Sequence, residues 1–223
     1  MERYINEIRV PKERVAVVIG KKGETKEKIE KELNCKLRID SETGLVTINS
    51  RDAIMLYKAS EIVKAIARGF SPENAFLLLK TDYVLEVISL KEYIKSSNRI
   101  KIVLGRIIGS SGKSKRTIEE LTNTIISVYG KTVSIIGETL DVINARRAIT
   151  MLINGAQHTR VFGFLSKTAE EVKNINMLGY QEREDVAYKK IDEKLKNKEK
   201  DDAVNKAMNK KIKKIKINRK SST

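Results

Sequence analysis

Residues 18–26 read Val-Ile-Gly-Lys-Lys-Gly-Glu-Thr-Lys, and residues 107–115 read Ile-Ile-Gly-Ser-Ser-Gly-Lys-Ser-Lys. In both stretches two glycines lie three positions apart, with apolar residues before them and a segment of helical character after them. Glycines let a backbone approach closely without side-chain collision, and the N–H groups at the start of a helix attract anions. Each stretch therefore predicts a tight loop that a phosphate backbone can approach.

The repetition of this pattern is more informative than the pattern itself. A chain with 12 glycines in 223 residues is expected to contain about 0.6 such glycine pairs by chance. Gly20 and Gly109 lie 89 positions apart, and the same offset aligns Ile29 with Ile118, Asn34 with Asn123, Leu37 with Ile126, Ile39 with Val128, Asp52 with Asp141 and Ala59 with Ala148. An internal repeat with matched apolar positions predicts two similar folded units, the second with a shorter turn between its last two strands.

Hydrophobic periodicity predicts the same order of elements in both copies: strand, short helix, loop, helix, strand, strand and long helix. In the first copy these elements are expected at residues 4–10, 12–19, 20–23, 24–33, 36–40, 45–48 and 52–68. In the second copy they are expected at residues 83–89, 97–108, 109–112, 113–123, 125–129, 132–136 and 139–154. Ser71 followed by Pro72 predicts the start of a linking helix, and one more helix is predicted at residues 166–174.

The charge of the chain indicates a polyanionic partner. With 45 Lys and Arg against 29 Asp and Glu, the formal net charge is +16 and the isoelectric point about 9.8. Such a balance favours RNA, DNA or an anionic membrane surface, although lysines on solvated faces are the simpler alternative. Aromatic residues make up 5% of the chain and tryptophan is absent, so a platform of stacked aromatic rings is not expected.

Several features predict a cytoplasmic protein with a hydrophobic core. The chain is 40% hydrophobic and 33% charged, and its apolar runs are far shorter than the roughly 20 residues that span a bilayer. Residues 1–7 carry charges where a signal peptide would have an apolar segment. Cys35 is the single cysteine, which excludes an internal disulfide and fits a reducing compartment.

Residues that could suggest catalysis or metal binding are better explained otherwise. Gly112-Lys113-Ser114 ends like a nucleotide-binding P-loop, but Ile107 stands where the first glycine of that motif is required. His158 is the only histidine, so with one cysteine no His/Cys metal cluster can form; we expect it in a loop after the last helix of the second copy. We therefore expect no catalytic residues, no metal site and no cofactor.

The order of elements around each G-x-x-G loop resembles the type I KH domain, a module that binds single-stranded nucleic acid. The resemblance covers residues 4–69 and 83–154. It implies an α+β fold with two tandem type I KH domains, each a three-stranded antiparallel sheet with three helices, followed by a basic C-terminal extension. It also implies that each loop clamps a short stretch of nucleotides, with bases along a groove lined by Ile19, Ile29, Leu37 and Ile39 in the first copy and Ile108, Ile118, Ile126 and Val128 in the second. The simpler alternative is that these aliphatic side chains are core, and we expect most of each to be buried, with only some edges facing bases.

The domain organisation expected from this resemblance has five parts. The first KH domain occupies residues 1–69, a helical linker 70–82 and the second KH domain 83–157. A C-terminal helix that packs on the second domain is expected at residues 158–180, and a basic, mobile tail at 181–223. Within that tail, residues 203–223 carry eight Lys or Arg and no acid, a composition that cannot bury much apolar surface.

The candidate RNA-binding residues lie in and around the two loops. In the first copy they are Gly20, Lys21, Lys22, Gly23, Lys26 and Arg38. In the second copy they are Arg106, Gly109, Ser110, Ser111, Gly112, Lys113, Lys115 and Arg116. The second loop itself is uncharged, so we expect the four cationic residues around it to supply the charge that binds phosphate.

Further segments narrow the resemblance. They are Gly-Arg-Ile-Ile-Gly at 105–109, Lys-Thr-Val-Ser-Ile-Ile-Gly at 131–137, Asn-Ala-Arg-Arg-Ala-Ile at 144–149 and Leu-Ile-Asn-Gly at 152–155. Over residues 4–170 the chain looks like the archaeal form of the Partner-of-Nob, or Dim-two, family of small-subunit ribosome assembly factors. The resemblance implies binding to the 3′ region of small-subunit rRNA and cooperation with a Nob-type endonuclease. We also expect the protein to be a monomer. The alternatives are a general or exosome-type KH protein, or a protein scaffold with incidental RNA contact.

Overall fold

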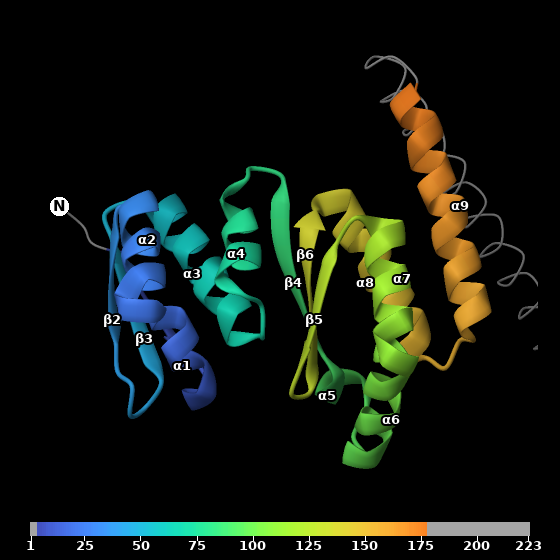
Figure 1. Ribbon diagram of the computed structural model, residues 1–223, viewed down its shortest axis with the longest axis horizontal. Coiled ribbons are helices and arrows are strands. Elements are labelled where there is room, and N and C mark those ends of the chain that lie inside the picture. Colours follow the sequence, from blue (N-terminus) through green and yellow to red (C-terminus); the bar gives the residue numbers. More distant parts are fainter. Residues whose placement is uncertain (1–3, 178–223) are drawn as a thin grey trace, which may run out of the picture. The chain divides into compact units, whose positions relative to one another are not determined.

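The structure is a computed structural model that describes residues 4–177, and within them the same sheet-and-helix unit is built twice (Figure 1). We call residues 4–79 the first domain and residues 83–169 the second domain. Contacts group the chain up to Ala169 into one compact unit that contains both domains. The predicted tail at 181–223 lies outside the described residues.

The first domain follows the order predicted from the sequence. Its elements are β1 (Tyr4–Arg9), α1 (Lys12–Ile19), the 3-10 turn η1 (Lys21–Gly23), α2 (Glu24–Glu32), β2 (Cys35–Ile39), β3 (Leu45–Ser50), α3 (Ala53–Ala67), α4 (Pro72–Ala75) and the 3-10 turn η2 (Phe76–Leu79). The side chain of Asp52 begins α3 by accepting from the N–H groups of Ile54 and Met55. Ser71 caps α4 and Pro72 is its first residue, as predicted.

The second domain repeats this order with one addition. Its elements are β4 (Tyr83–Ser89), α5 (Leu90–Tyr93), α6 (Ser97–Ile108), the 3-10 turn η3 (Ser110–Gly112), α7 (Lys113–Thr122), β5 (Ile125–Tyr129), β6 (Thr132–Glu138) and α8 (Thr139–Ile153), and α9 (His158–Met177) follows. The short helix α5 was not predicted. The last helix, α9, begins at His158, which is the start expected for a C-terminal helix at residues 158–180, whereas the narrower expectation of residues 166–174 was too short.

Each domain has one three-stranded antiparallel sheet, in the order β1-β3-β2 and β4-β6-β5. The strand after the G-x-x-G helix is therefore an edge strand in both copies. Leu37 on β2 lies opposite Ile48, and Ile126 on β5 lies opposite Ile135. Together with the helices, these sheets confirm the predicted α+β fold class.

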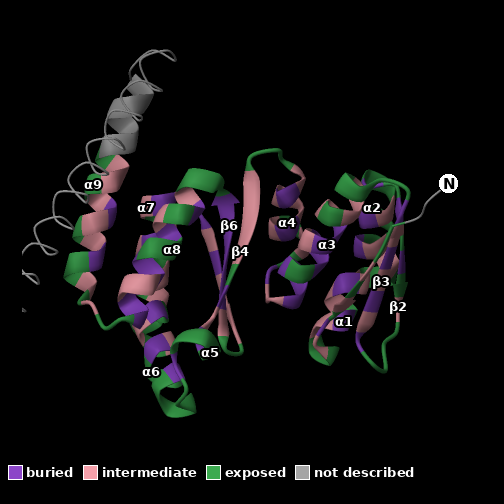
Figure 2. Ribbon diagram, turned by 180° about the vertical axis from the view of Figure 1, so that it is seen from behind, coloured by how far each residue is buried: buried purple, intermediate pink, exposed green. Residues whose placement is uncertain are grey.

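Helices cover one face of each sheet, and the side chains between them form the two cores (Figure 2). In the first core, Ile29 of α2, Ile48 of β3 and Ile62 of α3 are fully buried. The second core is built from Ile118, Ile135 and Ile149 on the matching elements, with Val161 and Leu165 from the start of α9 added to it. Burial of branched aliphatic side chains of this size contributes roughly 1.5–3 kcal/mol each.

The two domains share a buried contact. Ile136 of β6 is fully buried, and its side chain belongs to the core of the first domain, where Leu85 and Ile125 also pack. The Ser127 hydroxyl donates to the carbonyl oxygen of Arg68 at 2.9 Å. The second face of the β4–β6–β5 sheet is therefore covered by the first domain.

One part of the predicted alignment is wrong. Asp52, which caps α3, corresponds to Glu138, the residue before α8, at an offset of 86 positions. The buried Ala59 likewise corresponds to Ala145 and not to Ala148. The shorter turn between the last two strands of the second domain shifts everything after it, so the offset of 89 holds only as far as that turn.

Candidate nucleic-acid interface

The two G-x-x-G loops have the same backbone conformation. Gly20 has φ 78° and ψ 174°, and Gly109 has φ 72° and ψ 174°. The residue before the second glycine is left-handed in both loops, with φ 56° at Lys22 and φ 50° at Ser111. A non-glycine residue in this region costs roughly 1–3 kcal/mol, and such residues cluster at functional sites. The copies thus keep a strained loop shape while its side chains differ.

The two glycines of each loop have different tasks. A Cβ atom on Gly109 would lie 2.6 Å from the Cβ of Ser114, which is closer than real atoms approach. A Cβ on Gly112 would have no neighbour closer than 4.0 Å, so only its φ of 75° favours glycine there. Gly20 and Gly23 differ in the same way. The first glycine is needed for packing against the next helix, whereas the second leaves open space in front of the loop.

The two copies carry their positive charges at different places: the first copy has them in the loop, and the second has them on the helix after the loop. At positions aligned by the 89-residue offset, Lys21 and Lys22 correspond to Ser110 and Ser111, and Glu24 and Glu27 correspond to Lys113 and Arg116. These four side chains sum to zero charge in the first domain and to +2 in the second. The surroundings of the serine loop are therefore the more positive, although the loop itself carries no cation.

The cations around the second loop are engaged to different degrees. The Arg116 guanidinium donates to the carbonyl oxygen of Ser111 at 2.6 Å, which holds it against the loop. Lys115 binds both carboxylate oxygens of Glu119, at 2.9 and 3.0 Å. Lys113 is exposed at the first position of α7. Arg116 and Lys113 are thus the two predicted cations whose positions suit contact with a phosphate at the loop.

Arg106 contacts the end of another helix. Its guanidinium donates to the carbonyl oxygens of Leu152 and Ala156, at 3.2 and 2.5 Å. The Nε2 atom of His158 lies 2.9 Å from the carbonyl oxygen of Arg106. His158 is the first residue of α9 and not the loop residue that we predicted. These contacts explain Arg106 as a structural residue, and a role in RNA binding stays a prediction.

A basic groove of about 930 Å³ lies along α2 and the edge strand β2 of the first domain. Its lining includes two predicted residues, Lys26 and Arg38, and the further cations Lys36 and Arg51, with Glu30 as the acid among them. Cationic side chains spaced along such a groove suit the backbone of a single nucleic-acid strand. Lys21 and Lys22 are exposed on the loop that precedes α2.

One acidic turn follows the groove. Asp40, at the end of β2, accepts from the hydroxyl of Thr43 and from the N–H groups of Glu42 and Thr43. The hydroxyl of Thr43, followed by these N–H groups, lowers the pKa of the Asp40 carboxyl below its usual value. The carboxylate is therefore charged at neutral pH, and its charge is of the wrong sign for phosphate binding at this end of the groove.

The aliphatic side chains expected along the groove lie at different depths, and their contact with bases stays a prediction. Ile29 and Leu37 are buried in the first core, and Ile118 and Ile126 are buried in the second, at 4% exposure or less. The other predicted aliphatics are partly accessible; they are Ile19, Ile39, Ile108 and Val128. Leu37 and Ile39 both line the basic groove along β2, although most of the Leu37 side chain is in the core.

Two kinds of residue were missed by the sequence reasoning. Lys36 alternates with Arg38 along β2, and this period of two places both on the face away from the core. The alternation was a usable signal. Glu30 and Glu119 gave no signal in the sequence, because their importance comes from hydrogen bonds to the edge strands.

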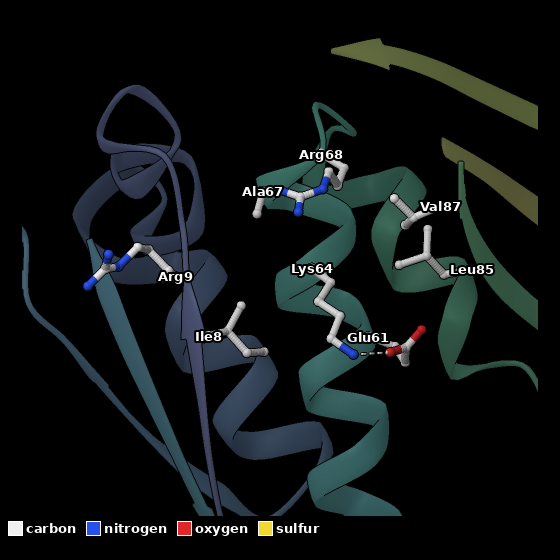
Figure 3. A pocket seen from close by; sticks show the side chains of 8 residues that line it. All are labelled: Ile8, Arg9, Glu61, Lys64, Ala67, Arg68, Leu85 and Val87. Carbon is white, nitrogen blue, oxygen red and sulfur yellow. Dashed lines mark hydrogen bonds and ion pairs between the residues drawn. The ribbon is translucent and has the colours of Figure 1, made fainter. Parts of the chain in front are cut away.

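A second cavity, of about 320 Å³, lies between β1, α3 and β4 (Figure 3). It is lined by Ile8, Arg9, Glu61, Lys64, Ala67, Arg68, Leu85 and Val87. Lys64 forms an ion pair with Glu61 at 2.8 Å. This pairing satisfies one of the cations there, and the cavity is smaller than the groove along β2.

Within the part of the chain that the structure describes, no group of three or more His, Cys, Asp or Glu is placed to hold a metal ion. Among those same residues, none of the helices has the length and apolar character needed to cross a membrane. Ser114, part of the P-loop-like stretch, is buried behind Gly109.

Comparisons with known proteins identify both domains as KH domains. A family model described as KH domain matches residues 5–65, and one described as eukaryotic type KH-domain (KH-domain type I) matches residues 84–170. A KH domain-containing protein of Methanocaldococcus jannaschii is 44% identical over 189 residues, which is 83% of each chain. The pre-rRNA-processing protein pno1 of Aspergillus fumigatus is 33% identical over 126 residues, which is 55% of this chain and 50% of that protein.

Solved structures are similar over most of the described residues. Dim2p from Pyrococcus horikoshii is 45% identical, with a TM-score of 0.68 over 74% of this chain and 99% of that chain. A structure of an a/eIF2alpha-aDim2p-rRNA complex from the same organism matches with 43% identity and a TM-score of 0.71, over 76% and 96% of the two chains. The repeated loop and sheet, the two family models and these relatives agree, and the chain belongs to the Partner-of-Nob/Dim-two (PNO1/Dim2) family of KH-domain ribosome-assembly proteins.

Proposed function

We propose that this protein binds single-stranded RNA at its two G-x-x-G loops and serves as an assembly factor of the small ribosomal subunit. The observation that carries the proposal is the strained loop conformation, which is the same in both domains although the loop side chains differ. The open space before Gly23 and Gly112 lets a sugar-phosphate chain come close to the loop backbone. The helix that starts at each loop directs its N–H groups toward that chain.

The proposed target is the 3′ region of small-subunit rRNA. Support comes from relatives named as pre-rRNA-processing or RNA-binding proteins and from the solved complex of a relative with rRNA. The protein would act as a cytoplasmic monomer beside a Nob-type endonuclease. It would hold the substrate RNA and would catalyse no reaction of its own.

Each domain is proposed to contribute differently. In the first domain, Lys21 and Lys22 meet phosphates at the loop, and the groove with Lys26 and Arg38 continues the path. In the second domain, Gly109 to Gly112 present backbone N–H groups while exposed residues of α7 supply the charge. The net charge of +16 adds attraction that does not depend on sequence and weakens with salt.

The second glycine of each loop offers the cleanest test. Gly112→Asp places a carboxylate in the open space in front of the loop, where it repels phosphate, and Gly23→Asp does the same in the first domain. We expect each change to weaken binding of a short single-stranded RNA from the 3′ end of small-subunit rRNA by about tenfold or more. Fluorescence anisotropy titration measures this.

Gly155→Asp is the matched control. Gly155 has φ 93°, and a Cβ atom added to it would have no neighbour within 4 Å, so the substitution introduces the same backbone strain at the end of α8. Unchanged RNA affinity of the Gly112 and Gly23 variants would contradict the proposal. A crosslinking map from cells separates the alternatives: one peak at an rRNA 3′ end, many peaks on mRNAs for a general KH protein, or none for a scaffold.

A further inference from the structure

Two glutamates make the same hydrogen bond in the two domains. The backbone N–H of Leu37, on β2, donates to Oε1 of Glu30 at 2.7 Å. The backbone N–H of Ile126, on β5, donates to Oε1 of Glu119, also at 2.7 Å. Both glutamates lie on the helix that follows a G-x-x-G loop, and both acceptors are seven residues before their donors. A contact kept in both copies of a diverged repeat indicates a shared task.

Each bond ties an edge strand to the helix that carries the loop. β2 and β5 have a sheet partner on one side only, so an outward N–H such as that of Leu37 finds no partner in the sheet. A carboxylate is a strong acceptor for it, because a bond to a charged group is about twice as strong as a neutral one. The side chains of Leu37 and Ile126 are buried, which fixes where these N–H groups point.

In the first domain the same two elements, α2 and β2, form the walls of the basic groove, and α7 and β5 are their counterparts in the second domain. In the first domain the groove is lined by α2 through Lys26 and Glu30 and by β2 through Arg38. Its width depends on how far the strand lies from the helix, and a misplacement on the order of 1 Å is enough to lose much of a binding contact. A hydrogen bond between the helix and the edge strand therefore affects RNA binding without a direct contact to RNA.

We propose that Glu30 and Glu119 are positioning residues that hold each edge strand at the RNA-binding distance from the helix after the loop. This inference rests on the proposed RNA-binding function. In the second domain Lys115 binds both oxygens of Glu119, which neutralises this glutamate and holds its carboxylate in place. In the first domain Lys26 occupies the aligned position on the groove wall.

The test compares two substitutions that separate the hydrogen bond from the charge. Glu119→Gln keeps an oxygen that accepts from the Ile126 N–H, whereas Glu119→Leu removes the acceptor. The control is Glu120→Leu, at the exposed neighbouring position. It replaces a carboxylate by the same apolar side chain, but the hydrogen bond to the Ile126 N–H is made by Glu119 and is left in place. The readouts are hydrogen exchange of the Ile126 amide by NMR and affinity for the rRNA 3′-end oligonucleotide.

We expect Glu119→Leu to speed Ile126 exchange and to weaken RNA binding by about tenfold, while Glu119→Gln and Glu120→Leu stay near wild type. Glu30→Leu and Glu30→Gln repeat the comparison in the first domain, should Glu119→Leu fail to fold. Faster exchange with unchanged RNA affinity would overturn the positioning role, as would equal losses for Gln and Leu. Wild-type protein that does not bind this RNA would overturn the proposed function instead, with Ile126 protection still reporting the hydrogen bond.

Discussion

Arg14 and Arg106 perform the same task from positions that the sequence repeat does not align. Arg14 donates to the carbonyl oxygens of Ile66 and Phe70 in the first domain. Arg106 donates to those of Leu152 and Ala156, which are the corresponding residues at the offset of 86. The two arginines are 92 positions apart, whereas α1 and α6 align at an offset of 89. Arg106 therefore makes the same contact from a position about one turn further along its helix than Arg14. In both copies the guanidinium donates to carbonyl oxygens at the C-terminal end of the long helix, α3 or α8, where the helix dipole is negative.

The variant Arg106→Met tests this structural assignment. Removal of the guanidinium leaves two partly buried carbonyl oxygens without their donor, so we expect a loss of about 2 kcal/mol in the free energy of unfolding. Denaturant unfolding measures it, with Arg99→Met, at an exposed position on the same helix, as the control. Normal stability with weakened RNA binding would instead support the RNA contact predicted from the sequence.

The sequence predicted the loops, the order of elements and the fold class, because those follow from local pattern and its repetition. The role of Arg106 could not be predicted, because its partners lie at the end of α8 and are known only once that helix has packed. The alignment of the two copies also changes, from an offset of 89 positions to one of 86, before α8 begins. The groove is a similar case. Ile29 was expected along the groove and is fully buried in the core, because periodicity places a residue on a face of its helix and does not say whether that face meets the core or a groove.

Arg116 and Glu27 offer a direct test of where the two copies carry their charge. Arg116→Met removes a cation and its bond to the Ser111 carbonyl, so RNA should bind more weakly and the slope of log affinity against log salt should decrease by about one. Glu27→Met, at the aligned position of the first domain, removes an acid near the loop and should leave affinity unchanged or raise it. Weakening of equal size by both variants would contradict this difference between the copies.

The two glycines of one loop should differ in their effect on stability. Gly112→Ala introduces a side chain at a positive φ with free space around it, so we expect a loss of about 1 kcal/mol. Gly109→Ala adds a collision with Ser114, so we expect a loss of about 2 kcal/mol or more. Thermal unfolding compares the two. Equal losses would show that the backbone beside Ser114 adjusts, and that both glycines serve conformation only.

The contact between the domains should make them unfold together. Ile136 is fully buried against the core of the first domain although it belongs to the second. Ile136→Ala should therefore cost about 2–4 kcal/mol and separate one unfolding transition into two. Calorimetry shows the number of transitions, and Ile143→Ala, at an exposed position of α8, is the control. A single transition in the variant would mean that other contacts suffice to couple the domains.

Cys35 should be unreactive in the folded protein. Burial, and after it the negative charge of Glu30, raises the pKa of this thiol to about 11, so hardly any thiolate is present at pH 8. Labelling with a thiol reagent should proceed only as fast as the protein opens, and it should become rapid in denaturant.

The unfolded thiol ionises at about pH 8.5. Below about pH 8.5 the Cys35 thiol is protonated in both the folded and the unfolded state, so it does not change the free energy of unfolding. Between about pH 8.5 and 11 the unfolded state loses this proton while the folded state keeps it, and the protein therefore becomes less stable as the pH rises. Glu30→Gln removes the second cause and should lower the pKa of Cys35 in a titration of thiolate absorbance. Rapid labelling of the native protein at pH 8 would contradict the burial of this side chain at the start of the edge strand β2.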